Sequence, residues 1–127
     1  RYIVVPDNNS GFIADPGLEY ILKHIGFQSI ITLKEMEKIT TNEIEITGVP
    51  FLGEHGDLNI QTKLAYHIKI YDKSFLFAVD SNNLDINLYH MLMAMIGPVN
   101  MLFIGMECVG APFSWAYGAL FHKPIKR

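Results

Sequence analysis

Three polar clusters in the sequence carry side chains that could bind a metal ion, and each directly follows an apolar stretch. The first contains Glu54 and His55 between two glycines, the second opens with Asp80, and the third holds Glu107 and Cys108. Carboxylates and imidazoles at the ends of neighbouring buried strands can converge on one metal-sized point, whereas a carboxylate inside such a strand would be an unpaired buried charge. The clusters therefore predict a metal site at one sheet edge. The competing interpretation is that every strand must end in a polar loop.

Glu54, His55 and Asp80 are the candidate metal ligands. Flanking glycines would let the backbone around Glu54 and His55 approach a ligand closely, and both side chains bind first-row metals, although an exposed turn would use the same residues. Asp80 ends a wholly apolar run, so it needs a partner. A bridging position between two cations is one solution, and an N-cap or turn role is the other. Glu107 beside Cys108 could pair a base with a nucleophile, but no histidine is near them in sequence, and we favour inert packing.

The apolar pattern supplies elements that could position these ligands. Residues 2–5 are predicted to be a core strand, residues 18–25 a short amphipathic helix that ends at Gly26, and residues 28–33 a second strand. Residues 34–38 carry charges of both signs and are predicted to be a solvated connector.

From residue 43 onward, the pattern alternates with a period of two, and continuous apolar runs follow. The expected elements are a strand over 43–49, hairpin strands over 63–71 and 75–79 around a turn at 72–74, a helix over 85–96, and a strand over 101–104. This order predicts an α/β (α+β mixed) fold in which helices cover a sheet.

The four histidines other than His55 are predicted to be surface residues rather than ligands. His67 alternates with apolar residues of its strand and should therefore face the polar side, while His24 and His90 lie on the expected helices. His122, near a basic run, is the least clear of the four.

Length and composition exclude several classes of protein. The 127 residues are 50% hydrophobic and are expected to form a single domain (residues 1–127) or a fragment of one. The net charge of −3 leaves no broad basic field, which disfavours nucleic acid and anionic lipid as partners. The most membrane-like stretch, residues 88–106, is interrupted by His90 and Asn100, so no membrane span is expected. A single cysteine, Cys108, fits the reducing cytoplasm.

Three segments resemble the later part of a metallo-β-lactamase-fold domain. They are residues 49–58 (VPFLGEHGDL), 76–81 (LFAVDS) and 102–112 (LFIGMECVGAP). The resemblance implies an αββα sandwich with a dinuclear metal site at one sheet edge, of which this chain would be the C-terminal portion. It also implies that Asp80 is the bridging carboxylate, and that the common pattern of the superfamily would make His55 the ligand of the preceding turn.

One subgroup of this superfamily resembles the chain more closely. It has a glutamate ligand and includes diiron oxygenases that β-hydroxylate amino acids tethered to carrier proteins, and Glu54 matches it by its spacing to Asp80. Glu54 is therefore the first choice of ligand and His55 the second. The motif His-x-His-x-Asp-His, which supplies most ligands in the superfamily, does not occur in these 127 residues. It is expected upstream of Arg1, in the remainder of the same polypeptide, and the last histidine ligand is expected downstream, with His122 as an alternative. This segment alone is expected to be catalytically incomplete.

Three functions are consistent with these residues. The leading prediction is a dinuclear hydrolase with two zinc or iron ions, in which a metal-bound water or hydroxide attacks an ester or amide bond of a small-molecule or carrier-tethered substrate. The alternative is a diiron oxygenase of the β-hydroxylase type, because an anionic ligand such as Glu54 suits iron better than zinc. The third is a metal-free interaction or scaffold domain. The missing motif favours this third function, whereas the strand-end positions of Glu54, His55 and Asp80 oppose it.

Overall fold

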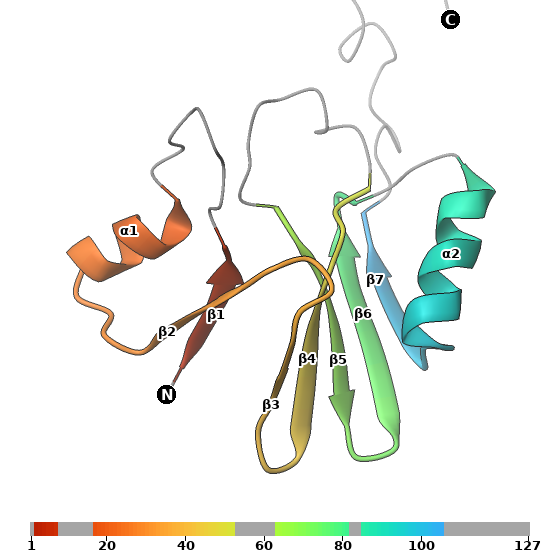
Figure 1. Cartoon of the computed structure of the whole chain (residues 1–127), viewed down its shortest axis with the longest axis horizontal. Coiled ribbons are helices and arrows are strands. Elements are labelled where there is room, and N and C mark those ends of the chain that lie inside the picture. Colours follow the sequence, from red (N-terminus) through yellow and green to blue (C-terminus); the bar gives the residue numbers. More distant parts are fainter. Residues whose placement is uncertain (1, 8–16, 53–62, 82–84, 106–127) are drawn as a thin grey trace, which may run out of the picture.

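The structure is a computed structural model of the chain, and it describes residues 2–7, 17–52, 63–81 and 85–105. Its elements are β1 (Ile3–Pro6), α1 (Leu18–His24), β2 (Ile30–Leu33), β3 (Lys38–Thr40), β4 (Ile44–Val49), β5 (Ala65–Ile70), β6 (Lys73–Val79), α2 (Ile86–Ile96) and β7 (Met101–Ile104). The strands form a two-stranded sheet, β1-β2, and a five-stranded sheet in the order β3-β4-β5-β6-β7 (Figure 1). The predicted mixed α/β class is confirmed.

The directions of the strands bring three strand ends to one edge of the larger sheet. Strand β5 is antiparallel to both β4 and β6, and β7 is parallel to β6. Strands β4, β6 and β7 therefore run in the same direction, and their carboxyl ends lie at the top of the sheet in Figure 1. We call this the site edge, defined by the last residues of the three strands, Val49, Val79 and Ile104.

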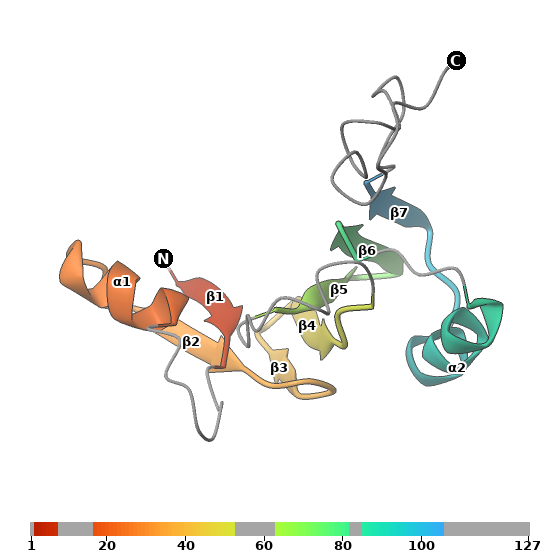
Figure 2. The same cartoon turned by 90° about the horizontal axis from the view of Figure 1, so that it is seen from above.

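Helix α2 connects β6 to β7 and covers one face of the five-stranded sheet (Figure 2). It begins where the Asp85 carboxylate accepts a hydrogen bond from the backbone N–H of Asn87, at 2.9 Å, and it ends at Gly97, whose φ of 78° a glycine adopts without strain. Its buried residues Leu92 and Ile96 pack in one core with residues from three strands of the sheet. Those residues are Val49, Ala65, Leu76 and Ala78.

The smaller sheet joins the larger one through the turn after β2. The backbone N–H of Met36 donates to the carbonyl of Gly48 in β4, at 2.7 Å, and the N–H of Gly48 donates to the carbonyl of Glu37, at 3.0 Å. A Cβ atom added to Gly48 would collide with the backbone carbonyl oxygen of Lys34. A glycine at this position therefore allows the turn to lie directly on β4.

Three details differ from the sequence-based prediction. Strand β3 was not expected, and it begins at Lys38, the last residue of the predicted solvated connector, because Lys38–Thr40 pairs with β4 and Lys38 forms a salt bridge with Glu45, at 3.0 Å. The hairpin turn falls one residue earlier than expected, since Ile70 pairs directly with Lys73. The apolar side of α1 is largely exposed in the described part of the chain.

None of the helices in the described ranges has the length and apolar character needed to cross a membrane.

The substitution Gly48→Ala tests how closely the turn packs on β4. We expect it to lower the free energy of unfolding by about 2 kcal/mol or more, because the new methyl group meets backbone atoms that cannot rotate away. Urea denaturation would measure the change. The control Ser29→Ala, at an exposed position, should stay within about 0.5 kcal/mol of the parent. Equal stability of the Gly48 and Ser29 variants would contradict the close packing.

Candidate functional site

Asp80 stands at the site edge directly after β6, and its side chain is exposed. The residue before it, Val79, has a φ of 44°, a backbone conformation that is a true outlier for a β-branched side chain. The ladder to β7 is irregular at the same point, because its register shifts between Phe77 and Val79. Such bulges redirect a side chain at the end of a strand, and strained residues of this kind cost roughly 1–3 kcal/mol. The backbone is thus bent just where the candidate ligand leaves the sheet.

Hydrogen bonds on both sides hold this bend in place. The N–H of Ser81 donates to the carbonyl of Ala78, at 2.7 Å, which closes a tight turn with Val79 and Asp80 at its centre. The N–H of Gly105, just after β7, donates to the carbonyl of Val79. A Cβ atom added to Gly105 would lie 2.9 Å from the Val79 carbonyl oxygen and 3.1 Å from Oδ1 of Asp80. The absence of a side chain at Gly105 therefore lets the Asp80 carboxylate lie against the end of β7.

The chain that continues from β4 reaches the same place. The backbone N–H of Leu52 donates to the hydroxyl of Ser81, at 2.6 Å, and that hydroxyl donates in turn to the carbonyl of Leu52, at 2.9 Å. Leu52 is the residue before Gly53, and Ser81 is the residue after Asp80. Leu52, which precedes the first polar cluster in the sequence, thus lies beside Ser81 of the second cluster at the site edge.

The candidate ligands are only partly described by the structure. Asp80 lies at the site edge and forms no salt bridge with a lysine or arginine of the described residues. Glu54, His55, Glu107 and Cys108 lie outside the described residues, so their roles stay predictions. No group of three or more histidine, cysteine, aspartate or glutamate side chains that could hold a metal occurs among the residues that the structure describes. An exposed carboxylate at a bent strand end is nevertheless chemically suited to a hard cation such as iron.

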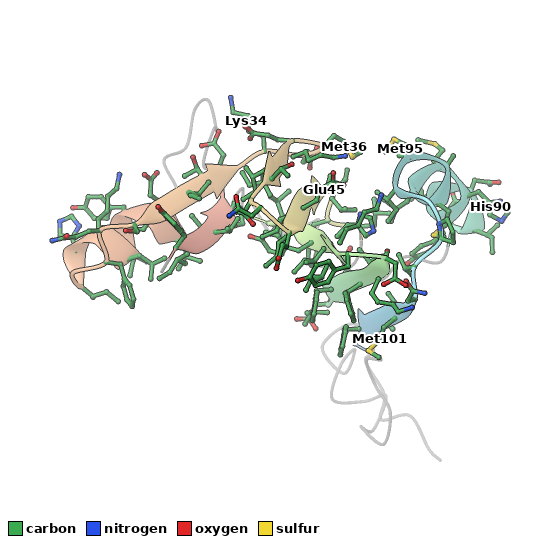
Figure 3. The ribbon with its side chains drawn as sticks, turned by 90° about the horizontal axis from the view of Figure 1, so that it is seen from below. Lys34, Met36, Glu45, His90, Met95 and Met101 are labelled. Atoms are coloured by element: carbon green, nitrogen blue, oxygen red, sulfur yellow. The ribbon has the colours of Figure 1, made fainter. Side chains whose placement is uncertain are left out.

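His67 lies in the interior, and the prediction of a surface position for it is wrong. Only 2% of it is exposed, on the face of β5 that α2 covers, and its Nε2 lies 2.8 Å from the hydroxyl of Ser74. The backbone N–H of Ser74 donates to the side-chain oxygen of Asn100, at 2.8 Å. The signal that could have found this network is the continuous apolar run of β6, which indicates burial on both sheet faces. His24 and His90 are exposed, as predicted (Figure 3, His90).

Burial sets the protonation of His67. Loss of hydration lowers its pKa below the ordinary value of 6.5, and the nearby Lys69 lowers it further, while Glu45 acts in the opposite direction. The imidazole is therefore neutral at pH 7. It has a structural role away from the site edge, since its partner Ser74 and the neighbouring Asn100 lie near the starts of β6 and β7, and the site edge lies at the ends of these strands.

An apolar cavity of about 130 Å³ lies between α2 and the sheet. Its lining includes Leu76, Leu92 and Leu102, and it reaches the site edge at Leu52 and Ser81. Because this lining is mostly apolar, a hydrogen bond between polar groups at that end of the cavity matters more than it would in water.

Comparison with known proteins adds a relative and its solved structures. No family model matches the chain. The chain is 40% identical over 125 residues to the 4-amino-L-phenylalanyl-[CmlP-peptidyl-carrier-protein] 3-hydroxylase of Streptomyces venezuelae. The matched region is 98% of this chain and 24% of the relative. The crystal structure of CmlA, a diiron β-hydroxylase from Streptomyces venezuelae, matches 99% of the chain with a TM-score of 0.76 and 40% identity. A glutamate-to-aspartate mutant of CmlA matches with the same TM-score and 39% identity.

The chain is similar in sequence and structure to CmlA, a metallo-β-lactamase-fold protein, and it spans about a quarter of the length of that relative. The predicted resemblance to this superfamily and to its glutamate-ligand subgroup is confirmed. The relatives do not support the hydrolase that the sequence analysis placed first, nor zinc, and they favour its diiron oxygenase alternative.

Acidification should lower the free energy of unfolding because His67 is buried. Between the lowered pKa of His67 in the folded chain and its unfolded value of 6.5, the unfolded chain binds more protons than the folded chain. The contribution of neutral His67 to the free energy of unfolding is therefore fully present above about pH 6.5 and is lost as the pH drops below that value. We expect His67→Gln to lower the free energy of unfolding at neutral pH but to weaken this decline, as measured by urea denaturation across the pH range. The control His90→Gln, at an exposed position, should leave the free energy of unfolding at neutral pH within about 0.5 kcal/mol of the parent. An unchanged slope in the His67 variant would contradict this account.

The bend before Asp80 predicts a stabilising substitution. Asparagine tolerates a positive φ better than valine does, and the Val79 side chain is 57% exposed, so little apolar burial would be lost. We expect Val79→Asn to raise the free energy of unfolding by about 1 kcal/mol. The matched change Val4→Asn, in the regular strand β1, should lower it. Destabilisation by Val79→Asn as large as that by Val4→Asn would show that the bend carries no strain.

Proposed function

We propose that this chain is the metal-binding later part of a diiron β-hydroxylase that acts on an amino acid tethered to a carrier protein. The observation that carries the proposal is its 40% identity, across 98% of its length, to a hydroxylase whose substrate is attached to a peptidyl carrier protein. The proposal replaces the hydrolase as the leading function. Bound iron ions would supply the oxidising chemistry, and the chain's own residues would hold and orient them.

In this proposal, Asp80 is the bridging carboxylate and Glu54 is the ligand of the preceding turn, with His55 as the second choice. Three features support the assignment of Asp80: its exposure, the bend at Val79, and the space that Gly105 leaves for its carboxylate. The assignment of Glu54 is supported by the anionic ligand sets that iron prefers.

Further ligands would come from other parts of the polypeptide. The relative is about four times as long as this chain, which leaves ample sequence for the histidine-rich motif that these residues lack. The single cysteine supports a reducing cytoplasmic setting, in which thiols stay reduced.

Iron analysis of single variants tests the proposed ligands. The purified full-length polypeptide, with the upstream histidine motif, should hold about two iron ions per molecule, and Asp80→Ala should remove most of at least one, because two cations a few ångströms apart repel strongly without a bridging anion. Glu54→Ala should also lose iron, whereas His55→Ala should retain it.

The control for these variants is Asp72→Ala. Asp72 is an exposed aspartate in the hairpin turn at the opposite end of β6 from Asp80, so its removal should leave the iron content unchanged. Loss of iron from His55→Ala but not from Glu54→Ala would make His55 the ligand. Full retention of iron in all three site variants would refute the proposed site.

A further inference from the structure

Ser81 makes an unusual pair of contacts for a single side chain. Its hydroxyl accepts a hydrogen bond from the N–H of Leu52 and donates one to the carbonyl of the same residue, at 2.6 and 2.9 Å. One hydroxyl thus provides hydrogen bonds to both the N–H and the carbonyl of Leu52. In a sheet, a neighbouring strand would provide these hydrogen bonds. Ser81 is only 4% exposed, so water does not readily replace it.

The bend at Val79 decides which way Ser81 faces. The turn closed by the Ser81 N–H and the Ala78 carbonyl places Asp80 beside Gly105 and turns Ser81 toward Leu52. Two consecutive residues therefore have different partners, since Asp80 meets the end of β7 and Ser81 meets the chain leaving β4.

We infer that Ser81 is a positioning residue, which fixes the chain at Leu52 relative to Asp80 and thereby sets the geometry of the metal site. The inference rests on the proposed function, because Leu52 leads into the stretch that carries Glu54. Ser81 is not proposed as a ligand itself, since it is buried and its hydroxyl oxygen already accepts a hydrogen bond from the Leu52 N–H.

The surroundings explain why no other group could replace this contact. Leu52 and Ser81 both line the apolar cavity beneath α2, and among the described residues Ser81 alone supplies a side-chain hydrogen bond to the N–H and the carbonyl of Leu52. Removing the hydroxyl takes this partner from both main-chain groups of Leu52. Movement of Leu52 toward water would then lower the free energy of the chain, and the distance from Leu52 to Asp80 would change.

Metal affinity separates a positioning role from a merely structural one. With iron added back to the metal-free full-length polypeptide, we expect Ser81→Ala to weaken iron binding at one site by ~10-fold or more, as removal of a group that orients a ligand typically does. Ser81→Thr keeps the hydroxyl and should bind iron within about threefold of the parent.

The matched control is Ser74→Ala. Ser74 is a buried serine at the other end of β6, hydrogen-bonded to His67, and its loss should lower the melting temperature without weakening iron binding. If Ser81→Ala also lowers only the melting temperature, Ser81 has a structural role and the inference is wrong.

Hydrogen exchange provides a readout that needs no metal. The Leu52 amide should exchange ~10-fold or more faster in Ser81→Ala than in the parent, and at the parental rate in Ser74→Ala, because only the first variant removes its acceptor. An unprotected Leu52 amide in the parent would overturn the inference. A parent that binds no iron, with Leu52 still protected by Ser81, would instead refute the proposed function.

Discussion

The antiparallel pairing of β5 with both of its neighbours is the constraint on which the rest of the molecule depends. Because β5 opposes β4 and β6, those two strands run the same way, and the segments that follow them leave the sheet at the same edge. Helix α2 then carries the chain back so that β7 joins in parallel, and a third strand end reaches that edge. The directions of the strands alone therefore bring residues from distant parts of the sequence to one edge. No contact between the side chains of these residues is needed for this.

The two ends of the larger sheet serve different physical purposes. At the site edge, the backbone of Val79 is strained, Gly105 has no side chain, and the candidate ligand Asp80 is exposed. At the other end, His67, Ser74 and Asn100 form a buried network that ties the hairpin to the start of β7. A satisfied polar network stabilises a unique arrangement, and its stability offsets the cost of strain at the edge where binding requires it.

The face of the sheet opposite α2 is apolar as well. Phe77 stacks on Phe103, with ring centroids 4.4 Å apart, and Met101 and Phe103 are 50% and 41% exposed (Figure 3, Met101). In the αββα sandwich of this superfamily, such a face packs against a second sheet. The chain spans only a quarter of its relative, and apolar exposure of this kind is what one part of a larger sandwich would show.

The sequence by itself determined the class of fold and most of the elements, because the alternation of β5 and the apolar spacing of α2 are local patterns that short-range geometry creates. Three of its segments also carried the resemblance to the superfamily. The sequence also placed Asp80 at a strand end. Only the tertiary structure decided the burial of His67, the pairing of β3, the positive φ of Val79 and the contact between Leu52 and Ser81. Each of these depends on what a distant part of the chain supplies: a helix over one face, a partner strand, a neighbouring amide or a hydroxyl. No local pattern carries that information, since the same residues in another fold would have different neighbours.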